Sequence, residues 1–514
     1  MIGFDSAAAG LIDRWTADGR LPTLAALRRR GAFGRMESTA QLNASPWPSF
    51  LTGTNPGDHG YHSFLMWDPE RMRHRRPDGR WPEVTPFWRE LSTQGPRVIT
   101  LDVPDTFPGP PFNGLEVGNW AGHYRMGPSY TIPADRMKAI KKRFGKDPMP
   151  LEKSGVMPVE GLLAIRDRLI DVTKVQTRLA LELIRSEPWD LFLMVYGATH
   201  RAGHQFWNDT GVEGTVPARR RAEFDQALLS IYAECDAGLG QILAQIDETT
   251  PVIVFACHGM TDNRSMVDLL PEMLRRVVHG NDQSSGLSRG TSSGLSQRLR
   301  QLLPLSWRSA VKDRLPQSWQ DSLTLAWRVE RQDWATTPVF CTMPDLQGHI
   351  QVNLAGRERN GIVRPDEYEF WLRKVTDGLM TFVDEDTGEP IVKAIWRPRE
   401  MYPDGRMAHF LPDLIVEWPP RMAARFTGMT SPRFGRITSP FNGKAPEGRP
   451  GHHDFDGWLI TTGPGIAAGS SIGRIHELDI APSLYQWFGL TIPSHFRGKP
   501  AEGLLPRPRA VRSG

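Results

Sequence analysis

The chain has little or none of several features that would place it in a specialised class. It contains only three cysteines in 514 residues, too few for a disulfide framework, which favours a reducing compartment and predicts a cytoplasmic location. No apolar run approaches the roughly 20 residues of a membrane-spanning helix, and the first residues lack the charged and apolar segments of a secretory signal. The formal net charge is only +4, without the dense basic patch that nucleic-acid binding requires. We therefore expect no transmembrane span and no nucleic acid polymer as a partner.

What the chain does contain is an alternation of short apolar runs and segments with helical periodicity. This alternation is typical of βαβ units, so we predict an α/β fold built on a mostly parallel sheet flanked by helices. The runs that we expect to form strands are 1–4, 98–103, 115–117, 191–196, 252–256, 414–417 and 458–461.

The length of the chain exceeds what one ordinary core needs, so we expect a core that carries an insertion. Residues 280–297 are rich in Ser and Gly and predict a flexible linker, which leads into a basic stretch with tryptophans at 302–327. The strand-like pattern returns at about residue 413. We therefore divide the chain into a core of residues 1–265 and 411–505, an inserted linker and cap region of residues 266–410, and a flexible tail of residues 506–514.

Four histidines and one aspartate lie at or near the ends of expected strands. The carboxyl ends of parallel strands meet at one edge of a sheet, where ligands bind. Because neutral imidazole is the commonest metal ligand near neutral pH, and three or four such ligands make a zinc-type site, the sequence predicts a metal centre at this edge. The candidate ligands are Asp5 at the end of the first run, His200 and His204 after 191–196, His258 after 252–256, and His453 before 458–461.

A second candidate site lies at the beginning of an expected helix. Ser45 is a good N-cap, and Pro46 suits the first helical position. A hydroxyl at that place lies against unpaired backbone N–H groups, which favour a bound phosphate; the alternative is that Ser45 only caps the helix. Farther along, Asn119 and His123 end another expected strand, where they either line the pocket or pack as an ordinary loop.

Several short motifs, each loose alone, follow one another in an order that one family shares. They span nearly the whole chain and include Ile2-Gly3-Phe4-Asp5, Ser49-Phe50-Leu51-Thr52-Gly53, Asn55-Pro56, His59-Gly60, His204-Gln205-Phe206-Trp207, His258-Gly259-Met260, Pro412-Asp413-Leu414 and Leu478-Asp479-Ile480-Ala481-Pro482-Ser483. In this ordered set the chain resembles the type I phosphodiesterase/nucleotide pyrophosphatase branch of the alkaline phosphatase superfamily. The resemblance implies an alkaline-phosphatase-like sheet with an inserted cap region.

The resemblance also implies a site with two divalent metal ions, usually zinc. In such enzymes one ion activates a Ser or Thr nucleophile, and the pair stabilises the charge that develops during displacement. Carried over by motif, Asp5 and His258 hold one ion together with the nucleophile. His200, His204 and His453 hold the other. His200 stands where the family usually has Asp, and imidazole remains a sound zinc ligand.

Two further departures from the family pattern bear on the chemistry. Cys257 replaces the carboxylate that the family carries before His258, so it either ligates zinc as a thiolate or fills a buried space beside a weakened site. The family's Ser or Thr nucleophile falls at Asn43, whose amide cannot attack. We therefore expect Ser45 to be the catalytic nucleophile and Asn43 to contact the phosphate, with direct attack by a metal-bound hydroxide as the alternative.

These residues predict a metal-dependent phosphohydrolase, a phosphodiesterase or pyrophosphatase that acts on a small-molecule phosphate ester. A sulfatase or phosphonate hydrolase on the same site is a second interpretation, although the Cys/Ser-x-Pro-x-Arg motif of the superfamily's sulfatases is absent. A third is a catalytically degenerate member that binds a phosphorylated ligand or a partner protein. The sequence indicates neither the physiological substrate nor the oligomeric state.

Overall fold

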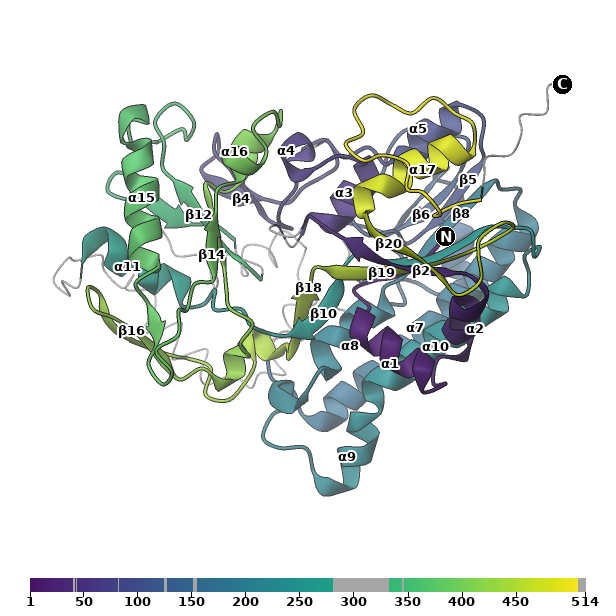
Figure 1. The fold of residues 1–514 in the computed structure, drawn as a ribbon, viewed down its shortest axis with the longest axis horizontal. Helices are drawn as coiled ribbons and strands as arrows, with labels where there is room; N and C mark the ends of the chain where they lie inside the picture. The colour runs from purple at the N-terminus through teal and green to yellow at the C-terminus, as the bar shows by residue number, and fades with distance from the viewer. Residues whose placement is uncertain are drawn as a thin grey trace.

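The structure, a computed structural model, describes residues 1–39, 42, 44–81, 83–123, 127–150, 155–280, 332–343 and 346–506. Within these ranges the largest element is a sheet of nine strands (Figure 1). From one edge to the other the strands are β20 (Ser470–His476), β2 (Ala32–Glu37), β19 (Asp456–Thr462), β9 (Val252–Ala256), β1 (Ile2–Phe4), β8 (Leu191–Tyr196), β5 (Val98–Leu101), β6 (Gly114–Gly118) and β7 (Tyr130–Ile132).

The centre of this sheet is parallel and buried on both faces. β1 pairs in parallel with β8 and β9, and β5 pairs in parallel with β6 and β8. β19 and β7 run against their neighbours. Every residue of β8 is buried, which is the continuous apolar pattern of a strand covered by helices on both sides. The predicted α/β fold with a mostly parallel sheet is confirmed.

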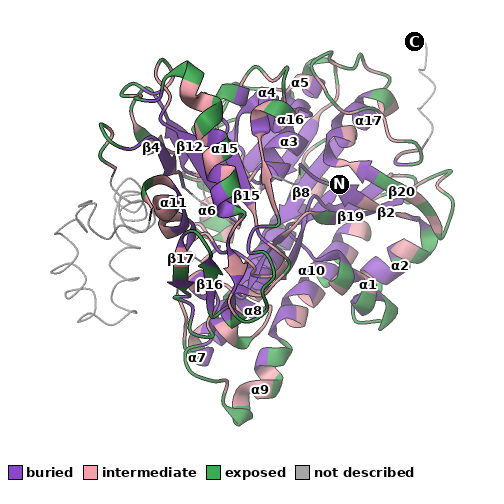
Figure 2. Ribbon diagram, turned by 60° about the vertical axis from the view of Figure 1, so that its left-hand side comes forward, coloured by how far each residue is buried: buried purple, intermediate pink, exposed green. Residues whose placement is uncertain are grey.

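Helices cover both faces of the sheet, and each face has its own apolar cluster. Phe192 and Met194 of β8 belong to one cluster, whereas Leu193 and Val195 belong to the other, because successive strand side chains point to opposite faces. Figure 2 shows the central strands and the inward sides of these helices buried. One face packs against α1 (Ala9–Ala17), α2 (Pro22–Arg30), α7 (Val159–Ser186), α8 (Ala198–Phe206) and α10 (Ala227–Leu243), and the other against α3 (Pro46–Thr52), α5 (Phe87–Thr93) and α17 (Ile480–Trp487).

A second region, mostly green in Figure 1, contains smaller antiparallel sheets. The segment 414–417, which the sequence predicts to rejoin the main sheet, forms β15 of this region instead, so that prediction is wrong. A buried apolar run shows the same pattern in either sheet, and its partners are therefore not readable from periodicity. The sheets consist of β11 (Val339–Cys341), β12 (Gly348–Val352), β15 (Leu414–Glu417) and β14 (Ala394–Trp396), and of β13 (Val383–Asp384), β16 (Gly428–Ser431) and β17 (Gly435–Thr438), with α11 (Leu270–His279) and α15 (Tyr368–Leu379) packed against them.

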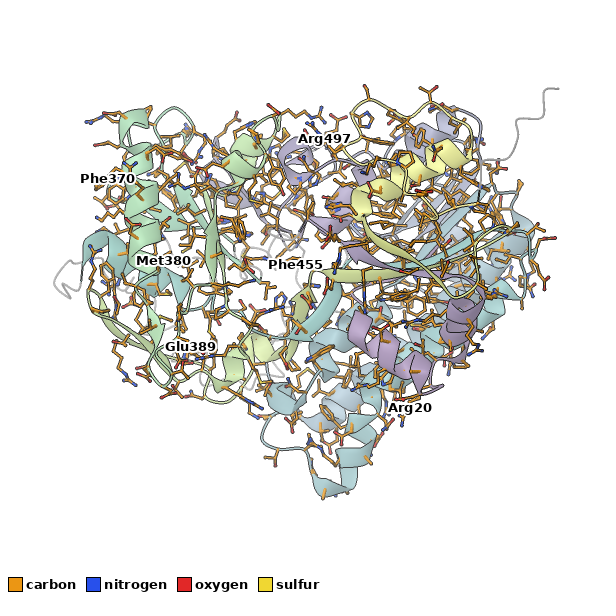
Figure 3. The ribbon with its side chains drawn as sticks, in the orientation of Figure 1. Arg20, Phe370, Met380, Glu389, Phe455 and Arg497 are labelled. Carbon is orange, nitrogen blue, oxygen red and sulfur yellow. The ribbon has the colours of Figure 1, made fainter. Side chains whose placement is uncertain are left out.

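The two regions are joined by an antiparallel ribbon of β10 (Gly259–Asp262) and β18 (Gly451–Asp454). β10 follows β9 out of the core, and β18 leads back into β19. Phe455, labelled in Figure 3, lies at this junction. The predicted boundaries at residues 265 and 411 stay a prediction, and the ribbon supports a return to the core near Gly451.

Three predicted segments fall on residues that the structure does not describe. The linker at 280–297 and the basic stretch at 302–327 lie outside the described residues except for Gly280, and the tail at 506–514 does so except for Pro506. Among the helices of the described ranges, none is both long and apolar enough to cross a membrane.

Candidate metal centre

Several elements deliver polar side chains to the edge of the main sheet at which its parallel strands end. Asp5 follows β1, two histidines lie on α8 directly after β8, His258 lies between β9 and β10, and His453 lies on β18. All of these side chains are buried. The structure thus brings together the residues that the sequence places at the ends of separate strands, because parallel strands end at a common edge and the antiparallel β19 begins there.

Three imidazoles form what we call the histidine group. One ring nitrogen from each of His200, His258 and His453 lies within 4.8 Å of the other two. These residues come from α8, from the end of β9 and from β18, so only the folded chain brings them together. Three nitrogen donors at such separations can share one tetrahedral ion.

His204 faces the histidine group from the next turn of α8. Its Nδ1 lies 2.8 Å from the carbonyl oxygen of Gly451, and its Nε2 lies 3.1 Å from Nε2 of His200. A carbonyl only accepts, so Nδ1 of His204 carries the proton and the lone pair of Nε2 points toward His200. Burial, followed by the charge of Arg449 and the neighbouring imidazoles, lowers the pKa of His204 well below its usual value. The ring is therefore neutral, which is the form that binds a metal.

Asp5, His123 and His200 form a second set, the aspartate group, whose ligand atoms also lie within 4.8 Å of one another. Oδ2 of Asp5 lies 2.6 Å from Nδ1 of His123 and 3.1 Å from Nδ1 of His200. Oδ1 accepts from the indole N–H of Trp47 at 2.8 Å. Burial alone would raise the pKa of Asp5, but attraction to His123 and His200 holds it well below its usual range. The carboxylate is therefore ionised, as ligation requires.

The position of His123 depends on a loop that Asp102 holds. Asp102 follows β5 with a φ of 52°, and its Oδ1 accepts from the backbone N–H groups of Trp120 and Ala121 at 2.8 and 2.9 Å. Its Oδ2 accepts from the side chain of Gln176 at 3.1 Å. Burial raises the pKa of Asp102 to about 6 despite these donors. No motif points to Asp102, and its one signal in the sequence is a carboxylate inside an apolar run.

Ser6 is a second residue that no motif indicates. It is fully buried, with 0% of its surface exposed, and its φ of 51° lies in the left-handed region that residues with a side chain rarely adopt. Its Oγ lies 2.7 Å from Nε2 of His258, 2.9 Å from Nδ1 of His200 and 3.3 Å from Nδ1 of His453. The histidine group therefore surrounds a serine hydroxyl, and its only signal in the sequence is its place next to Asp5.

Ser45 precedes α3 as predicted, but its hydroxyl contacts the backbone of another segment. It donates to the carbonyl oxygen of Tyr61 at 2.7 Å, it is fully buried, and it does not cap α3. Trp47, two residues later, reaches Asp5, so the beginning of the helix lies beside the aspartate group. Asn43 lies outside the described residues, and its predicted contact with phosphate stays a prediction.

Cys257 and Asn119 belong to neither group among the described residues. Cys257 is fully buried in the apolar cluster on the α3 face, where burial, with the carboxyl groups of Glu477 and Asp5, raises the pKa of its thiol well above the usual value. Asn119 adopts a φ of 56° and lines a separate cavity beside Phe107. Their predicted roles as metal ligand and substrate contact stay predictions.

The donors of the two groups fit a divalent ion of the zinc class. Zinc takes imidazole nitrogen and carboxylate oxygen in four-coordinate sites, and both kinds of donor are present in the ionisation state that ligation needs. Because both groups contain His200, they are adjoining halves of one centre. Two bound ions, and zinc as their identity, stay predictions.

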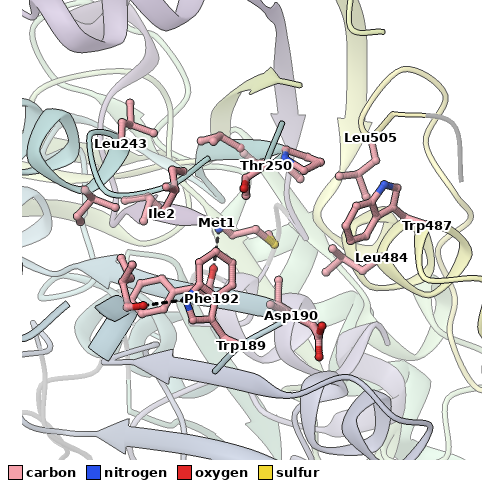
Figure 4. A pocket seen from close by; sticks show the side chains of 17 residues that line it. Met1, Ile2, Trp189, Asp190, Phe192, Leu243, Thr250, Leu484, Trp487 and Leu505 are labelled. Carbon is pink, nitrogen blue, oxygen red and sulfur yellow. Dashed lines mark hydrogen bonds between the residues drawn. The ribbon is translucent and has the colours of Figure 1, made fainter. Parts of the chain in front are cut away.

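A cavity at the opposite edge of the sheet has a different character (Figure 4). It is lined by the beginnings of β1, β8 and β9 and by large apolar side chains that include Trp189, Phe192 and Trp487. It contains none of the metal-ligand groups found among the described residues. The metal-ligand groups found among the described residues lie at the carboxyl edge of the sheet instead.

Comparison with known proteins gives one family. A sequence profile of the family described as type I phosphodiesterase / nucleotide pyrophosphatase matches residues 1–432. No curated protein sequence matches the chain.

Solved structures of phosphonoacetate hydrolase share the fold at low sequence identity. The chain is similar to phosphonoacetate hydrolase from Sinorhizobium meliloti 1021 in complex with phosphonoacetate, with a TM-score of 0.51, 12% identity and 93% of each chain covered. The same enzyme in complex with phosphonoformate gives a TM-score of 0.50 at 12% identity, with 93% of each chain covered. Murine ectonucleotide pyrophosphatase / phosphodiesterase 5 gives 0.48 at 12% identity, with 96% of this chain and 95% of that chain covered. At such identity the likeness to the hydrolase shows the fold alone.

Proposed function

We propose a function for this chain from its family, because the chain belongs to the type I phosphodiesterase/nucleotide pyrophosphatase family of the alkaline phosphatase superfamily. Members of this family are enzymes that hydrolyse phosphoester bonds. The proposed function is that of a metal-dependent phosphodiesterase or pyrophosphatase. Its substrate in this proposal is a small-molecule phosphate ester. The family and the fold are those that the sequence predicts. The choice of metal, nucleophile and substrate class belongs to the proposal.

One observation supports the proposal above the others, namely a buried carboxylate that meets imidazoles at the carboxyl edge of the parallel strands. Asp5 and His123 would hold one side of the centre, and the histidine group the other. The hydrogen bond from His204 to Gly451 orients its ring toward this group. Divalent ions held there would neutralise the charge of a phosphate and stabilise the additional charge that develops during displacement.

We propose that Ser45 is the attacking group. It lies at the beginning of α3, two residues before Trp47, whose indole donates to Asp5. To attack phosphorus, the hydroxyl must leave the carbonyl of Tyr61 and give up its proton to a base as the oxygen–phosphorus bond forms and the ester leaving group departs. Water is the alternative attacking group. The Ser45→Ala variant separates the two, since unchanged turnover would assign the attack to water.

The proposal is tested with bis(p-nitrophenyl) phosphate and a dinucleoside pyrophosphate as substrates. Protein stripped of metal with a chelator is compared with protein reconstituted with zinc, and we expect turnover only after reconstitution. His258→Ala should abolish that turnover. His495→Ala is the matched control, because 52% of the His495 side chain is exposed. Turnover that survives stripping, or that His258→Ala leaves unchanged, would contradict the proposal.

The same substrate screen addresses the alternatives. Phosphonoacetate and p-nitrophenyl sulfate test a phosphonate hydrolase and a sulfatase on the same centre. Faster cleavage of either compound than of the phosphate esters would replace the proposed substrate class. A protein that binds zinc but converts none of these compounds would favour a non-hydrolytic member of the family.

We keep a cytoplasmic location as part of the proposal. Cys235 and Cys257 are fully buried thiols, and burial raises the pKa of Cys235 to about 12. Cysteines that form no disulfide, as these and Cys341 among the described residues, suit a reducing compartment. Location of a tagged protein by cell fractionation would test this point.

A further inference from the structure

We infer that the hydroxyl of Ser6 is a ligand of the ion held by the histidine group, so that three imidazole nitrogens and one serine oxygen make up this half of the centre. The inference rests on the metal-dependent function proposed above. It adds a ligand that none of the sequence motifs indicates, and it identifies a reason for the conformation of Ser6.

The number of polar atoms around Oγ of Ser6 fits a shared ion better than a set of ordinary hydrogen bonds. Zinc binds imidazole nitrogen at about 2.0–2.1 Å, so tetrahedral ligands lie roughly 3.3 Å from one another. Oγ lies 2.7, 2.9 and 3.3 Å from the three ring nitrogens, and Oδ1 of Asp5 is a fourth polar atom at 3.5 Å. A hydroxyl has one proton and two lone pairs and cannot satisfy four partners. A cation among these atoms satisfies the lone pair of every donor at once.

The backbone of Ser6 directs its hydroxyl into the histidine group. Its φ of 51° is costly for a residue other than glycine, and such conformations persist where the surrounding structure imposes them, often at functional sites. A capping role does not explain the serine, because the N-cap of α1 is Ala8 and no side chain caps that helix. The hydroxyl contacts the side chains of the centre instead.

A serine ligand has a consequence for the two halves of the centre. Three nitrogens and one oxygen complete a four-coordinate shell, as in metal sites that have no position open to substrate. The histidine group with Ser6 is then the closed half. Substrate would meet the aspartate group, where Asp5 and His123 supply the donors.

Ser6→Ala and Ser6→Gly test the inference on the full-length protein. Both variants remove Oγ, but alanine keeps a side chain in the left-handed conformation, whereas glycine relieves it. Zinc affinity is measured by competition with a chromogenic chelator, and the visible spectrum of the cobalt-substituted protein reports the ligand set. We expect both variants to bind one ion per chain roughly tenfold or more weakly than the wild type, with altered cobalt bands. Ser49→Ala is the matched control, since it removes a buried hydroxyl that lies 3.1 Å from His59, outside the centre.

The outcomes separate this inference from the proposed function. Unchanged affinity and an unchanged cobalt spectrum in both Ser6 variants, beside a wild type that binds metal, would overturn the inference alone. Tighter binding in both variants would also overturn it, because Ser6 would then obstruct the ion. A wild type that binds no metal would overturn the inference and the proposed function together. Thermal unfolding of the metal-free proteins checks folding, and Ser6→Gly carries the test if Ser6→Ala does not fold.

Discussion

Two sets of buried histidines in this molecule differ in what their ring nitrogens face. In the structural pair, His59 and His62, the partners are mostly backbone groups. Nδ1 of His59 accepts from the N–H of Tyr61 at 3.0 Å, and Nδ1 of His62 donates to the carbonyl of Gly60 at 3.0 Å. In the histidine group, ring nitrogens from distant segments lie near one another and around one serine hydroxyl.

Burial and neutrality do not distinguish the two sets. Burial lowers the pKa of both His59 and His62 to about 3, and burial also lowers the pKa of His453, in the histidine group, well below its usual range. The distinction lies in the partners, since a nitrogen paired with a backbone group has no lone pair or proton left for other chemistry. A buried histidine becomes a candidate ligand when its nitrogen faces other donors.

The largest expected effect comes from Asp5→Asn. The substitution keeps the shape of the side chain but removes the negative charge that the aspartate group contributes. We expect loss of at least one bound ion. Loss of a residue that only supports a metal ligand lowers activity roughly 10- to 100-fold, and we expect turnover to fall by more than that. Asp18→Asn, at an exposed site, should change neither quantity. Elemental analysis and steady-state kinetics provide the measurements, and full zinc content in Asp5→Asn would count against Asp5 as a ligand.

A smaller effect is expected from Asp102→Ala. The variant removes the acceptor for the N–H groups of Trp120 and Ala121, so the loop that carries His123 loses its support. We expect zinc affinity to fall by about tenfold, as for other supporting residues, with turnover recovered at saturating zinc. Equal turnover losses at low and at saturating zinc would contradict a positioning role.

His59→Ala should affect stability but not metal content. It leaves the buried N–H of Tyr61 without its acceptor, which costs about 1–3 kcal/mol of the free energy of unfolding. His59→Asn places an oxygen near the position of Nδ1 and should recover part of that loss. Urea unfolding of the metal-free proteins measures the difference, and elemental analysis of the zinc-loaded proteins checks the metal. A drop in bound zinc would show that His59 contributes to metal binding and does not have a purely structural role.

The smallest effect is a dependence of stability on pH. His59 and His62 have pKa values near 3 in the folded protein, against a usual value of 6.5. In the unfolded chain they gain protons as the pH falls below that value, so the unfolded state binds more protons and the free energy of unfolding decreases. Asp102, whose pKa is raised to about 6, opposes this decrease because it is protonated more readily when folded.

The His59→Asn variant isolates one part of this dependence. Urea unfolding at about pH 7 and about pH 5 should show a smaller loss of stability in the variant than in the wild type, since one titrating group is gone. The metal-free protein is used so that ligand protonation does not contribute through bound metal. An identical loss in both proteins would show that His59 does not titrate as its burial indicates.

The local pattern of the sequence determined several strands, the family and the edge of the sheet at which the candidate ligands meet. The apolar runs that form β8 and β9 are readable because a strand buried on both faces is apolar at every position. The order of the motifs identified the family, and the place of Asp5, His200, His258 and His453 relative to strand ends identified the edge at which they meet. These features depend on residues that are close in sequence, where periodicity and chain direction suffice.

The remaining features of the fold and of the candidate site depend on which distant segments meet, so only the tertiary structure decided them. The run 414–417 has the pattern of a strand, yet its partners lie in the second region. His123 reaches Asp5 through a loop that Asp102 holds. Ser6 and His453 are 447 residues apart in the sequence and 3.3 Å apart in space. No spacing in a sequence encodes such a contact, which exists only once β1 and β18 are placed at the same edge of the folded sheet.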